Sequence, residues 1–500
     1  MINYDFDVVI VGCGPTGATL ANFLGEKGLR VGIFEKEPTV YHSPRAQHMD
    51  GEVMRIMQSI GLSEEVLKIT NRPKGMHFYN DEGKTLMEWE MPEDLGPLGW
   101  GSDYMFYQPE LEKVLRKGLE RYENVSLFLQ HEVIEVSQDE EKAVIKVRDG
   151  NTETYKEVTT LYAVGCDGSK SMVRKEMGTK FNDYGMHQPW LIIDILAKRP
   201  LDLPEYLIQY CEPSRPITFV PVGFGRYRWE IMEITGDDQT EMERKDNIWE
   251  ILSRWVTPED ADLVRAKFYT FHSLIVEHWG KGRLFLAGDA AHLTPPFFGQ
   301  GMCSGIRDAA NLGWKLPMVI RGEADHSLLE SYELEREPHF HSIMDMSMKL
   351  GSIVQTTDPE VAKKRDEKML EGNEKIATLS YPLGSGLQNN KDKLAGIISP
   401  QPKLNDGTRM DDYVGNRFSV IIKEELLENV SAETRKIWEE VDAKVLSNEC
   451  DEIMDYMDDQ NIKAMIIRPD RYILGVANNH EGLDLISVKI PVRNKASNRK

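Results

Sequence analysis

Cysteines, long apolar runs and basic residues are scarce in this 500-residue sequence, and each scarcity narrows the possible classes of protein. The five cysteines are scattered and include no CxxC pair, which favours reduced thiols in a cytoplasmic protein over a disulfide framework or a zinc site. No apolar run approaches the ~18 residues that a membrane-spanning helix needs. Lysine and arginine total 60 against 82 acidic residues, for a net charge of −22, so a nucleic-acid partner is not expected.

Internal repeats and a basic N-terminal leader segment are also missing. Five hundred residues are too many for one hydrophobic core, and two or three domains are expected. Together these features predict a cytoplasmic multidomain protein with neither a membrane nor a nucleic acid as partner.

A dinucleotide-binding pattern is present at the start of the chain. An apolar strand at 5–11 runs into the glycine-rich segment 12–17, an amphipathic helix follows to about residue 27, and a second strand at 30–34 ends at Glu35. The glycines of such a turn let a pyrophosphate approach a helix N-terminus, and the acidic side chain accepts ribose hydroxyls. The pattern by itself does not separate FAD from NAD(P).

Two later turns have the same character. The apolar run 163–165 ends at a turn containing Asp167, and the run 283–287 ends at the Gly288–Asp289 turn. A glycine-rich loop then leads into a helix from about Cys303, whose N–H groups and dipole form a socket for an anion. Three such turns without a second nicotinamide-type glycine pattern favour one large ligand, FAD, as the resident cofactor.

Two stretches between the turns are of strand type. Residues 124–163 alternate as short strands and predict a three- or four-stranded antiparallel insert. Residues 181–275 carry aromatic side chains on strand-like segments, for which a flat apolar pocket and plain core packing are equally good explanations. A Pro-Pro-Phe-Phe loop at 295–298 is expected on the substrate side, where it would help to exclude water.

The three turns resemble those of the group A flavoprotein aromatic hydroxylases, which are FAD-dependent monooxygenases of the para-hydroxybenzoate hydroxylase fold. Within this family the segments SPRAQHMD, FYQPELE, WLIIDI, CEPSRP and GDAAHLTPPFFGQG are most similar to 3-(3-hydroxyphenyl)propionate hydroxylases. The resemblance covers about residues 5–350. The C-terminal part resembles the thioredoxin-like domain of phenol-hydroxylase-type members, although it contains only Cys450.

This resemblance implies an α/β protein, α+β overall, in which a Rossmann-like FAD-binding domain is interleaved with a β-sheet substrate domain and followed by a thioredoxin-like domain. The implied boundaries are 1–180 and 276–355 for the FAD-binding domain, 181–275 for the substrate domain, 356–400 for a helical linker and 401–495 for the C-terminal domain.

Site residues follow from the same resemblance. Glu35 would bind the adenosine ribose, Asp289 the ribityl chain, and Asp167 both FAD and NAD(P)H, while Gly301 and Met302 would offer backbone N–H groups to the flavin ring. The full implied FAD-binding set is Gly12, Gly14, Pro15, Gly17, Glu35, Lys36, Arg45, Gln108, Asp167, Gly288, Asp289, Pro296, Gly299, Gly301 and Met302.

The implied reaction is hydroxylation of a phenolic compound by O2 and NADH or NADPH through a flavin C4a-hydroperoxide, with a 3-(3-hydroxyphenyl)propionate-like substrate of aromatic catabolism. The alternatives are a flavin monooxygenase that tailors a polyketide or antibiotic and an oxygen-independent flavin dehydrogenase. The family also implies a homodimer and no metal. Cys303 departs from the family, in which Asn is common at that position. No catalytic residue is assigned; candidates to contact the phenol or NAD(P)H are Tyr184, His187, Tyr210, Arg215 and His292.

Overall fold

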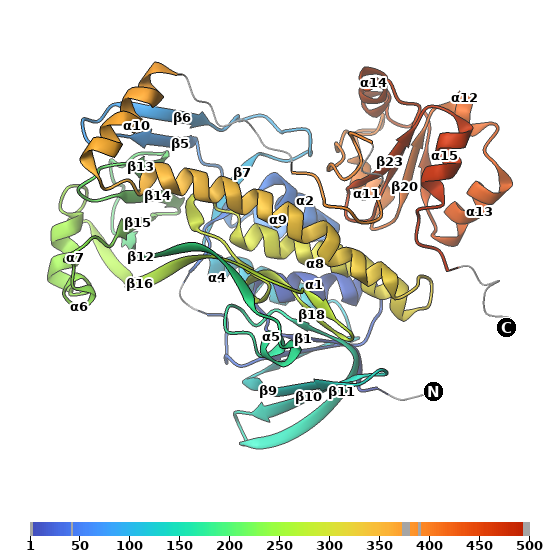
Figure 1. Ribbon diagram of the computed structural model, residues 1–500, viewed down its shortest axis with the longest axis horizontal. Helices are drawn as coiled ribbons and strands as arrows, with labels where there is room; N and C mark the ends of the chain where they lie inside the picture. Colours follow the sequence, from blue (N-terminus) through green and yellow to red (C-terminus); the bar gives the residue numbers. More distant parts are fainter. Residues whose placement is uncertain (1–3, 42–43, 373–380, 389–391, 494–500) are drawn as a thin grey trace.

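The computed structural model describes residues 4–41, 44–372, 381–388 and 392–493. In these residues the protein is of the mixed α/β class that the sequence predicts, with two eight-stranded sheets, one four-stranded sheet and one three-stranded sheet. Figure 1 shows the long helix α9 (Ser327–Val354) crossing the middle of the molecule, with the C-terminal unit to one side of it. Within the described ranges no helix has both the length and the apolarity to cross a membrane. The predicted cytoplasmic location stays a prediction.

The first large sheet is parallel at its centre, in the order β18-β11-β1-β2-β8, and its strands come from distant parts of the chain. Val8 to Ile10 of β1 are completely buried, as is typical of a parallel strand that is covered on both faces. The strands are β1 (Phe6–Val11), β2 (Val31–Glu35), β8 (Val125–Leu129), β11 (Thr154–Gly165), β17 (Gly280–Lys281) and β18 (Leu284–Leu286).

The predicted antiparallel insert at 124–163 is correct only for its later strands. β9 (His131–Gln138) and β10 (Ala143–Asp149) pair antiparallel with each other and with β11. β8 instead pairs parallel with β2, because helix α4 (Gln108–Leu119) precedes it and carries the chain back to the end of the sheet at which β2 begins.

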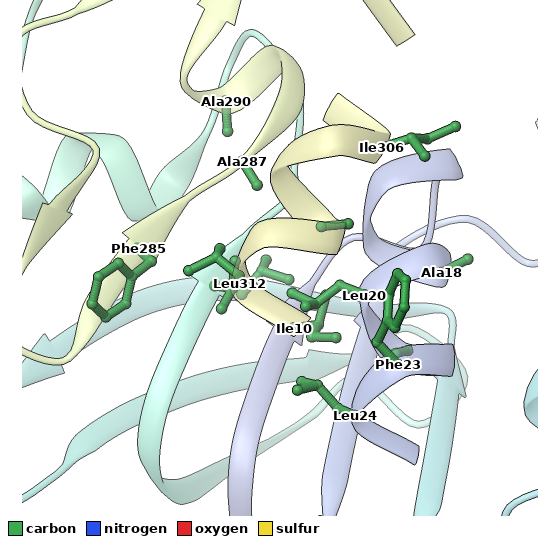
Figure 2. Packing of buried hydrophobic residues seen from close by; sticks show 14 of the residues in the cluster. Ile10, Ala18, Leu20, Phe23, Leu24, Phe285, Ala287, Ala290, Ile306 and Leu312 are labelled. Carbon is green, nitrogen blue, oxygen red and sulfur yellow. The ribbon is translucent and has the colours of Figure 1, made fainter. Parts of the chain in front are cut away.

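Helices α1 (Pro15–Glu26) and α8 (Gly301–Ile320) pack together over this sheet. Figure 2 shows Leu20 and Phe23 of α1 close to Leu312 of α8, above Ile10 of β1. A Cβ atom on Gly313 would lie 2.8 Å from the Cβ of Phe23, so only glycine allows this close approach of the two helices. The N-termini of both helices are therefore held at one end of the sheet.

The second large sheet is mostly antiparallel, in the order β19-β16-β12-β15-β14-β13-β5-β6. Its residues alternate between two faces: Phe219 and Trp229 pack against α7 (Lys245–Leu252), whereas Arg228 and Glu230 line a cavity on the other face. The strands are β5 (Gly75–Tyr79), β6 (Thr85–Glu90), β12 (Phe181–Ala197), β13 (Leu207–Tyr210), β14 (Ile217–Gly223), β15 (Arg226–Met232), β16 (Ala261–Val276) and β19 (His292–Leu293).

The C-terminal unit has a four-stranded sheet in the order β21-β20-β22-β23, with β20 and β21 parallel and the other neighbours antiparallel. Helix α10 (Pro359–Glu371) lies in the predicted helical linker, of which residues 373–380 and 389–391 are outside the described part. The elements of the unit are α11 (Met410–Val414), β20 (Ser419–Ile422), α12 (Glu424–Leu427), α13 (Ala432–Glu440), β21 (Lys444–Leu446), α14 (Asp451–Asp459), β22 (Ala464–Ile467), β23 (Ile473–Ala477) and α15 (His480–Ser487).

The smaller elements complete the fold around the two large sheets. They are β3 (His48–Asp50), α2 (Gly51–Ser59), α3 (Ser63–Leu67), β4 (Thr70–Asn71), β7 (Asp103–Phe106), α5 (Met172–Met177), α6 (Gln239–Met242), and the 3₁₀ turns η1 (Gly288–Ala290) and η2 (Pro296–Phe298). Strands β3, β7 and β4 form the three-stranded sheet.

Candidate active site

A cavity of about 1490 Å³ lies between the first turn, the second large sheet and the N-terminus of α8. Single small-molecule sites usually occupy about 300–1,000 Å³, so this volume admits a large ligand together with a smaller one. The C-terminal unit contributes Tyr456 and Tyr472 to its wall. Of the predicted FAD-binding residues, those that line the cavity are Gly12, Gly14, Pro15, Glu35, Lys36, Arg45, Gln108, Asp167, Asp289, Pro296, Gly299, Gly301 and Met302.

The glycines of the first turn are at positions where the structure leaves no room for a side chain or where the helix start faces open space. Gly12 has φ +95°, and a Cβ atom there would lie 2.5 Å from the carbonyl oxygen of Cys166. A Cβ atom on Gly17 would overlap the carbonyl oxygen of Gly12, so Gly17 allows the helix to pack on the turn and does not face the cavity. Gly14 faces open space at the uncapped N-terminus of α1. This geometry suits a pyrophosphate at the helix start.

Glu35 is fixed beside this turn by two backbone donors. Its Oε2 accepts a hydrogen bond from the Cys13 N–H at 2.8 Å, and its Oε1 accepts one from Glu37 N–H at 3.0 Å. Arg116, which is not among the residues predicted from the sequence, donates to the Cys13 carbonyl and also lines the cavity. Its spacing of eight residues from Gln108 on α4 places both on one helix face and could have revealed it.

Gln108 positions the chain rather than offering its amide to the cavity. Its Oε1 accepts hydrogen bonds from the N–H groups of Arg45 and Ala46, and its Nε2 donates to Glu112 at 2.8 Å. The half-exposed Arg45 guanidinium lies 3.8 Å from the Asp289 carboxylate across the cavity wall. The structure thus brings Arg45 and Asp289, two of the predicted FAD-binding residues, close together.

Asp167 lines the cavity and is held by one of its two carboxylate oxygens. Oδ2 accepts a hydrogen bond from Met172 N–H at 2.6 Å at the start of α5, and Oδ1 is buried without a partner among the described residues. Burial raises the pKa of Asp167. Asp167 therefore lines the cavity as a carboxyl group that is anchored to the start of α5.

The Gly288–Asp289 turn is held from behind by Asp308. The Asp308 carboxylate is completely buried and accepts hydrogen bonds from Gly288 N–H at 3.0 Å, from His292 Nε2 at 2.7 Å and from Arg336 Nε at 2.9 Å. Gly288 itself packs on α1, since a Cβ atom there would lie 2.7 Å from Thr16 Oγ1. His292 is therefore part of this support and does not line the cavity, which contradicts its place among the phenol candidates.

Helix α8 begins at Gly301, two residues before the predicted start, and its first N–H groups meet the cavity without a side-chain cap or an acidic residue in the first turn. Such an end attracts anions. Cys303 points away from the cavity, with its Sγ 3.8 Å from the carbonyl oxygen of His48 and 3.7 Å from that of Gly299. Burial raises the pKa of this thiol.

The four remaining substrate or NAD(P)H candidates lie outside the cavity. Tyr184 is 39% exposed, His187 is bonded to Asp183 on the surface, Tyr210 packs against Trp255, and Arg215 is paired with Asp237. Tyr184, His187 and Tyr210 are on strands whose side-chain alternation turns them elsewhere, whereas Arg215 is in the turn between β13 and β14. The second sheet and the loops beside it instead supply Met76, Trp89, Ile192, Leu207, Gln209, Thr218, Val220, Arg228, Glu230, Arg265, Tyr269, Phe271, Phe297 and Phe298.

A buried charge network forms the floor of this second part of the cavity, which we call the sheet lobe. Asp194 accepts a hydrogen bond from Arg228 Nε at 2.7 Å, and its other oxygen lies 3.3 Å from Arg265 Nε. Glu230 lies 3.6 Å from Arg228. Both guanidiniums also donate to the carbonyl of Pro44. The network pairs two cations with two anions.

Comparisons with known proteins agree with this geometry. The family model described as "FAD binding domain" matches residues 5–347. A probable NADH-specific resorcinol 4-hydroxylase of Rhodococcus jostii (strain RHA1) is 34% identical over 97% of this chain and 96% of its own. A 3-(3-hydroxy-phenyl)propionate/3-hydroxycinnamic acid hydroxylase of Mycolicibacterium smegmatis is 34% identical over 83% of this chain and 76% of its own. The crystal structure of aklavinone-11 hydroxylase with FAD and aklavinone has the same fold, with a TM-score of 0.84 at 19% identity, over 98% of this chain and 100% of that one.

Proposed function

We propose, for a chain that belongs to the FAD binding domain family and is a flavin-dependent aromatic hydroxylase, that the substrate is an uncharged phenol of about the size of resorcinol. When bound, FAD supplies the exchange of electrons between NAD(P)H, O2 and the phenol, which yields the hydroxylated product, NAD(P)+ and water. The turns described above fit FAD, because two uncapped helix starts and the carboxylates of Glu35 and Asp289 surround one cavity.

The charge balance of the sheet lobe carries the substrate proposal. Arg228 and Arg265 are already paired with Asp194, and Arg228 also faces Glu230, so neither guanidinium is in excess. Arg307, another cation of the cavity wall, is held by Asp50 and Glu52. A substrate carboxylate in this lobe would lack a surplus cation, and a buried unpaired charge is strongly disfavoured.

Neutral hydroxyl groups, by contrast, find partners in the lobe. The Glu230 carboxylate lines the lobe and can accept a hydrogen bond from a hydroxyl group. Gln209 and Thr218 add neutral polar atoms beside it, and Thr218 donates to Gln209 at 2.6 Å. Phe271 and other apolar side chains supply the surface for an aromatic ring. A phenol with a second hydroxyl matches this combination.

A matched pair of substrates tests the proposal directly. The acid 3-(3-hydroxyphenyl)propionate and its primary amide have nearly the same shape, and only the acid is charged. We expect kcat/KM to be at least about tenfold higher for the amide, which corresponds to about 1.4 kcal/mol, and resorcinol to be accepted. The assay is substrate-dependent NADH oxidation with O2 uptake, and mass spectrometry identifies the hydroxylated product. Preference for the acid over the amide would contradict the proposal.

One substitution should reverse the selectivity. Glu230→Gln removes one anion from the sheet lobe and leaves positive charge in excess at Arg228, so the ratio of kcat/KM for acid to amide should rise. Glu233→Gln is the matched control, because Glu233 follows the same strand and does not line the cavity. An equal effect of both substitutions would assign the change to general electrostatics.

We also propose NADH as the reductant and the domain boundaries that the family implies. The reductant follows from the printed name of the Rhodococcus relative. The boundaries are supported by the first sheet, to which segments 1–180 and 276–355 contribute, and by the second sheet, most of which comes from 181–275 with β5, β6 and β19 added. The thioredoxin-like nature of 401–495 and a homodimeric assembly remain proposals from the family.

A further inference from the structure

The imidazole of His48 lies directly behind the loop at the start of α8. Its Nδ1 is 3.3 Å from the carbonyl oxygen of Gly299, and its Nε2 is 2.7 Å from Oδ1 of Asp103. The ring packs on Gly299, where a Cβ atom would lie 2.7 Å from Nδ1. His48, Asp103 and Gly299 all line the cavity. The histidine therefore ties β3 to the loop that precedes Gly301.

Both nitrogens of this ring face acceptors. An ionised carboxylate and a backbone carbonyl accept hydrogen bonds and do not donate them, so the imidazole satisfies both partners only as the doubly protonated cation. Although burial alone would lower it, the hydrogen bond to the Asp103 carboxylate and the neighbouring Cys303 side chain raise the pKa of His48 well above its ordinary value. The largely buried ring places this charge where water screens it weakly.

The charged side chains around the loop are mostly acidic, so the protonation state of His48 changes the net charge beside the loop. Asp50, Glu52 and Asp103 supply three carboxylates, whereas Arg307 supplies one guanidinium, which is paired with Asp50 and lies 2.7 Å from Glu52. With His48 neutral this group would carry a net charge of −2, and with His48 protonated it carries −1. An added negative charge beside the loop is therefore opposed less when the imidazolium is present.

We propose that the His48 imidazolium, held by Asp103, is a positioning residue that stabilises reduced FAD and so raises the reduction potential of the flavin. NADH passes a hydride, that is two electrons and one proton, to FAD and leaves as NAD+. Bound FAD would therefore gain one unit of negative charge on this two-electron reduction. A cation behind the loop stabilises the reduced flavin more than the oxidised flavin. The inference depends on the flavin cofactor and not on the proposed substrate.

The reduction potential of bound FAD in three variants tests this role. His48→Gln should lower the equilibrium constant for flavin reduction against a reference dye by at least about tenfold, equivalent to about 30 mV for a two-electron couple. His48→Gln combined with Asp103→Asn removes a cation and an anion together, so most of the wild-type potential should return. His77→Gln is the control, because His77 is also buried and lies 3.0 Å from a carboxylate, Glu90, but does not line the cavity.

A structural role would give a different pattern. If the single and double variants had equally low potentials, or if His48→Gln kept the wild-type potential, the proposal would be overturned. Should His48→Gln weaken FAD binding, the dissociation constants of oxidised and reduced FAD measure the same quantity. The constant for reduced FAD must then rise at least about tenfold more than that for oxidised FAD; an equal rise overturns the proposal.

Discussion

Replacing Glu335 by glutamine is expected to loosen the C-terminal unit from the rest of the molecule. Glu335 on α9 accepts hydrogen bonds from Lys315 of α8 at 2.7 Å and from both terminal nitrogens of Arg468 in the C-terminal unit at 2.8 Å. Arg468 also pairs with Asp470 at 2.6 Å. All four side chains are almost completely buried, so two cations balance two anions in an apolar environment.

The magnitude follows from this balance. Glutamine keeps the shape of Glu335 but leaves one buried cation in excess, and breaking a buried ion pair in this way costs about 3–5 kcal/mol. Burial lowers the pKa of Lys315 to about 8 even with its partner present. In Glu335→Gln the pKa of Lys315 should fall further. Between the Lys315 pKa of the variant and that of the wild type, the folded variant therefore binds fewer protons than the folded wild type. The difference in the free energy of unfolding between wild type and variant should therefore become smaller as pH rises from 6 to 8.5.

Urea unfolding followed by tryptophan fluorescence measures the effect, because Trp314 donates a hydrogen bond to Asp470 at 3.0 Å and reports on this junction. Limited proteolysis shows whether the C-terminal unit is the part that loosens. The double variant Lys315→Met/Glu335→Gln restores neutrality and should recover about 1–3 kcal/mol relative to the sum of the single effects. A Glu335→Gln protein as stable as the wild type, or strict additivity in the double variant, would refute the reasoning.

Three further predictions concern the cofactor site and the interface. Gly305→Ala would place a methyl group over the hydroxyl of Thr16. The FAD content of the purified protein, measured by absorbance after incubation with saturating FAD, should therefore fall at least about tenfold. A normal FAD content would contradict this packing argument. Asp289→Ala should raise the dissociation constant of FAD at least about tenfold by fluorescence titration, and full flavin occupancy after dialysis would rule out its assignment. Although burial opposes it, Arg471 and Arg55 lower the pKa of Asp411. The folded pKa of Asp411 is thus below its unfolded value, so the stability that this carboxylate contributes is present above about pH 4 and is lost as pH falls further. Asp411→Asn should therefore destabilise the protein at pH 7 and flatten the dependence of Tm on pH below 4. A dependence of Tm on pH below 4 that equals that of the wild type would contradict this role of Asp411.

The elements that sequence predicts well are those whose cause is local. A strand, a glycine turn and a helix follow one another within residues 5–27, and the glycine at position 12 needs its positive φ whatever the distant chain does. The pairing of β8 with β2 is not local, because it depends on where α4 returns the chain. The addition of β5 to the second sheet joins residues more than 130 positions apart, such as Met76 and Leu207, and no sequence pattern within either strand predicts this pairing.

The candidate site divides in the same way. Glu35 and Asp289 stand at the ends of recognisable strands, so their place in the cavity wall could be foreseen from the sequence. Tyr210 could not be placed, since an apolar strand does not tell which of its faces meets the cavity, and Arg215 could not be placed because its partner Asp237 is brought to it by the fold. The place of His48 in the cavity wall could not be predicted from the sequence, because its partners Asp103 and Gly299 lie 55 and 251 positions away along the chain.

The packing around Thr16 sets the order in which the chain can become a flavoprotein during synthesis. Its hydroxyl fills the space that only glycine leaves at both Gly288 and Gly305, so the first turn is complete only when a segment almost 300 positions later has arrived. At translation rates of about 5–20 residues per second, roughly 15–60 s separate the emergence of α1 from that of α8. Until then β2, β11 and α4 can cover β1 and the rest of α1, but the face of α1 that packs on α8 has no partner.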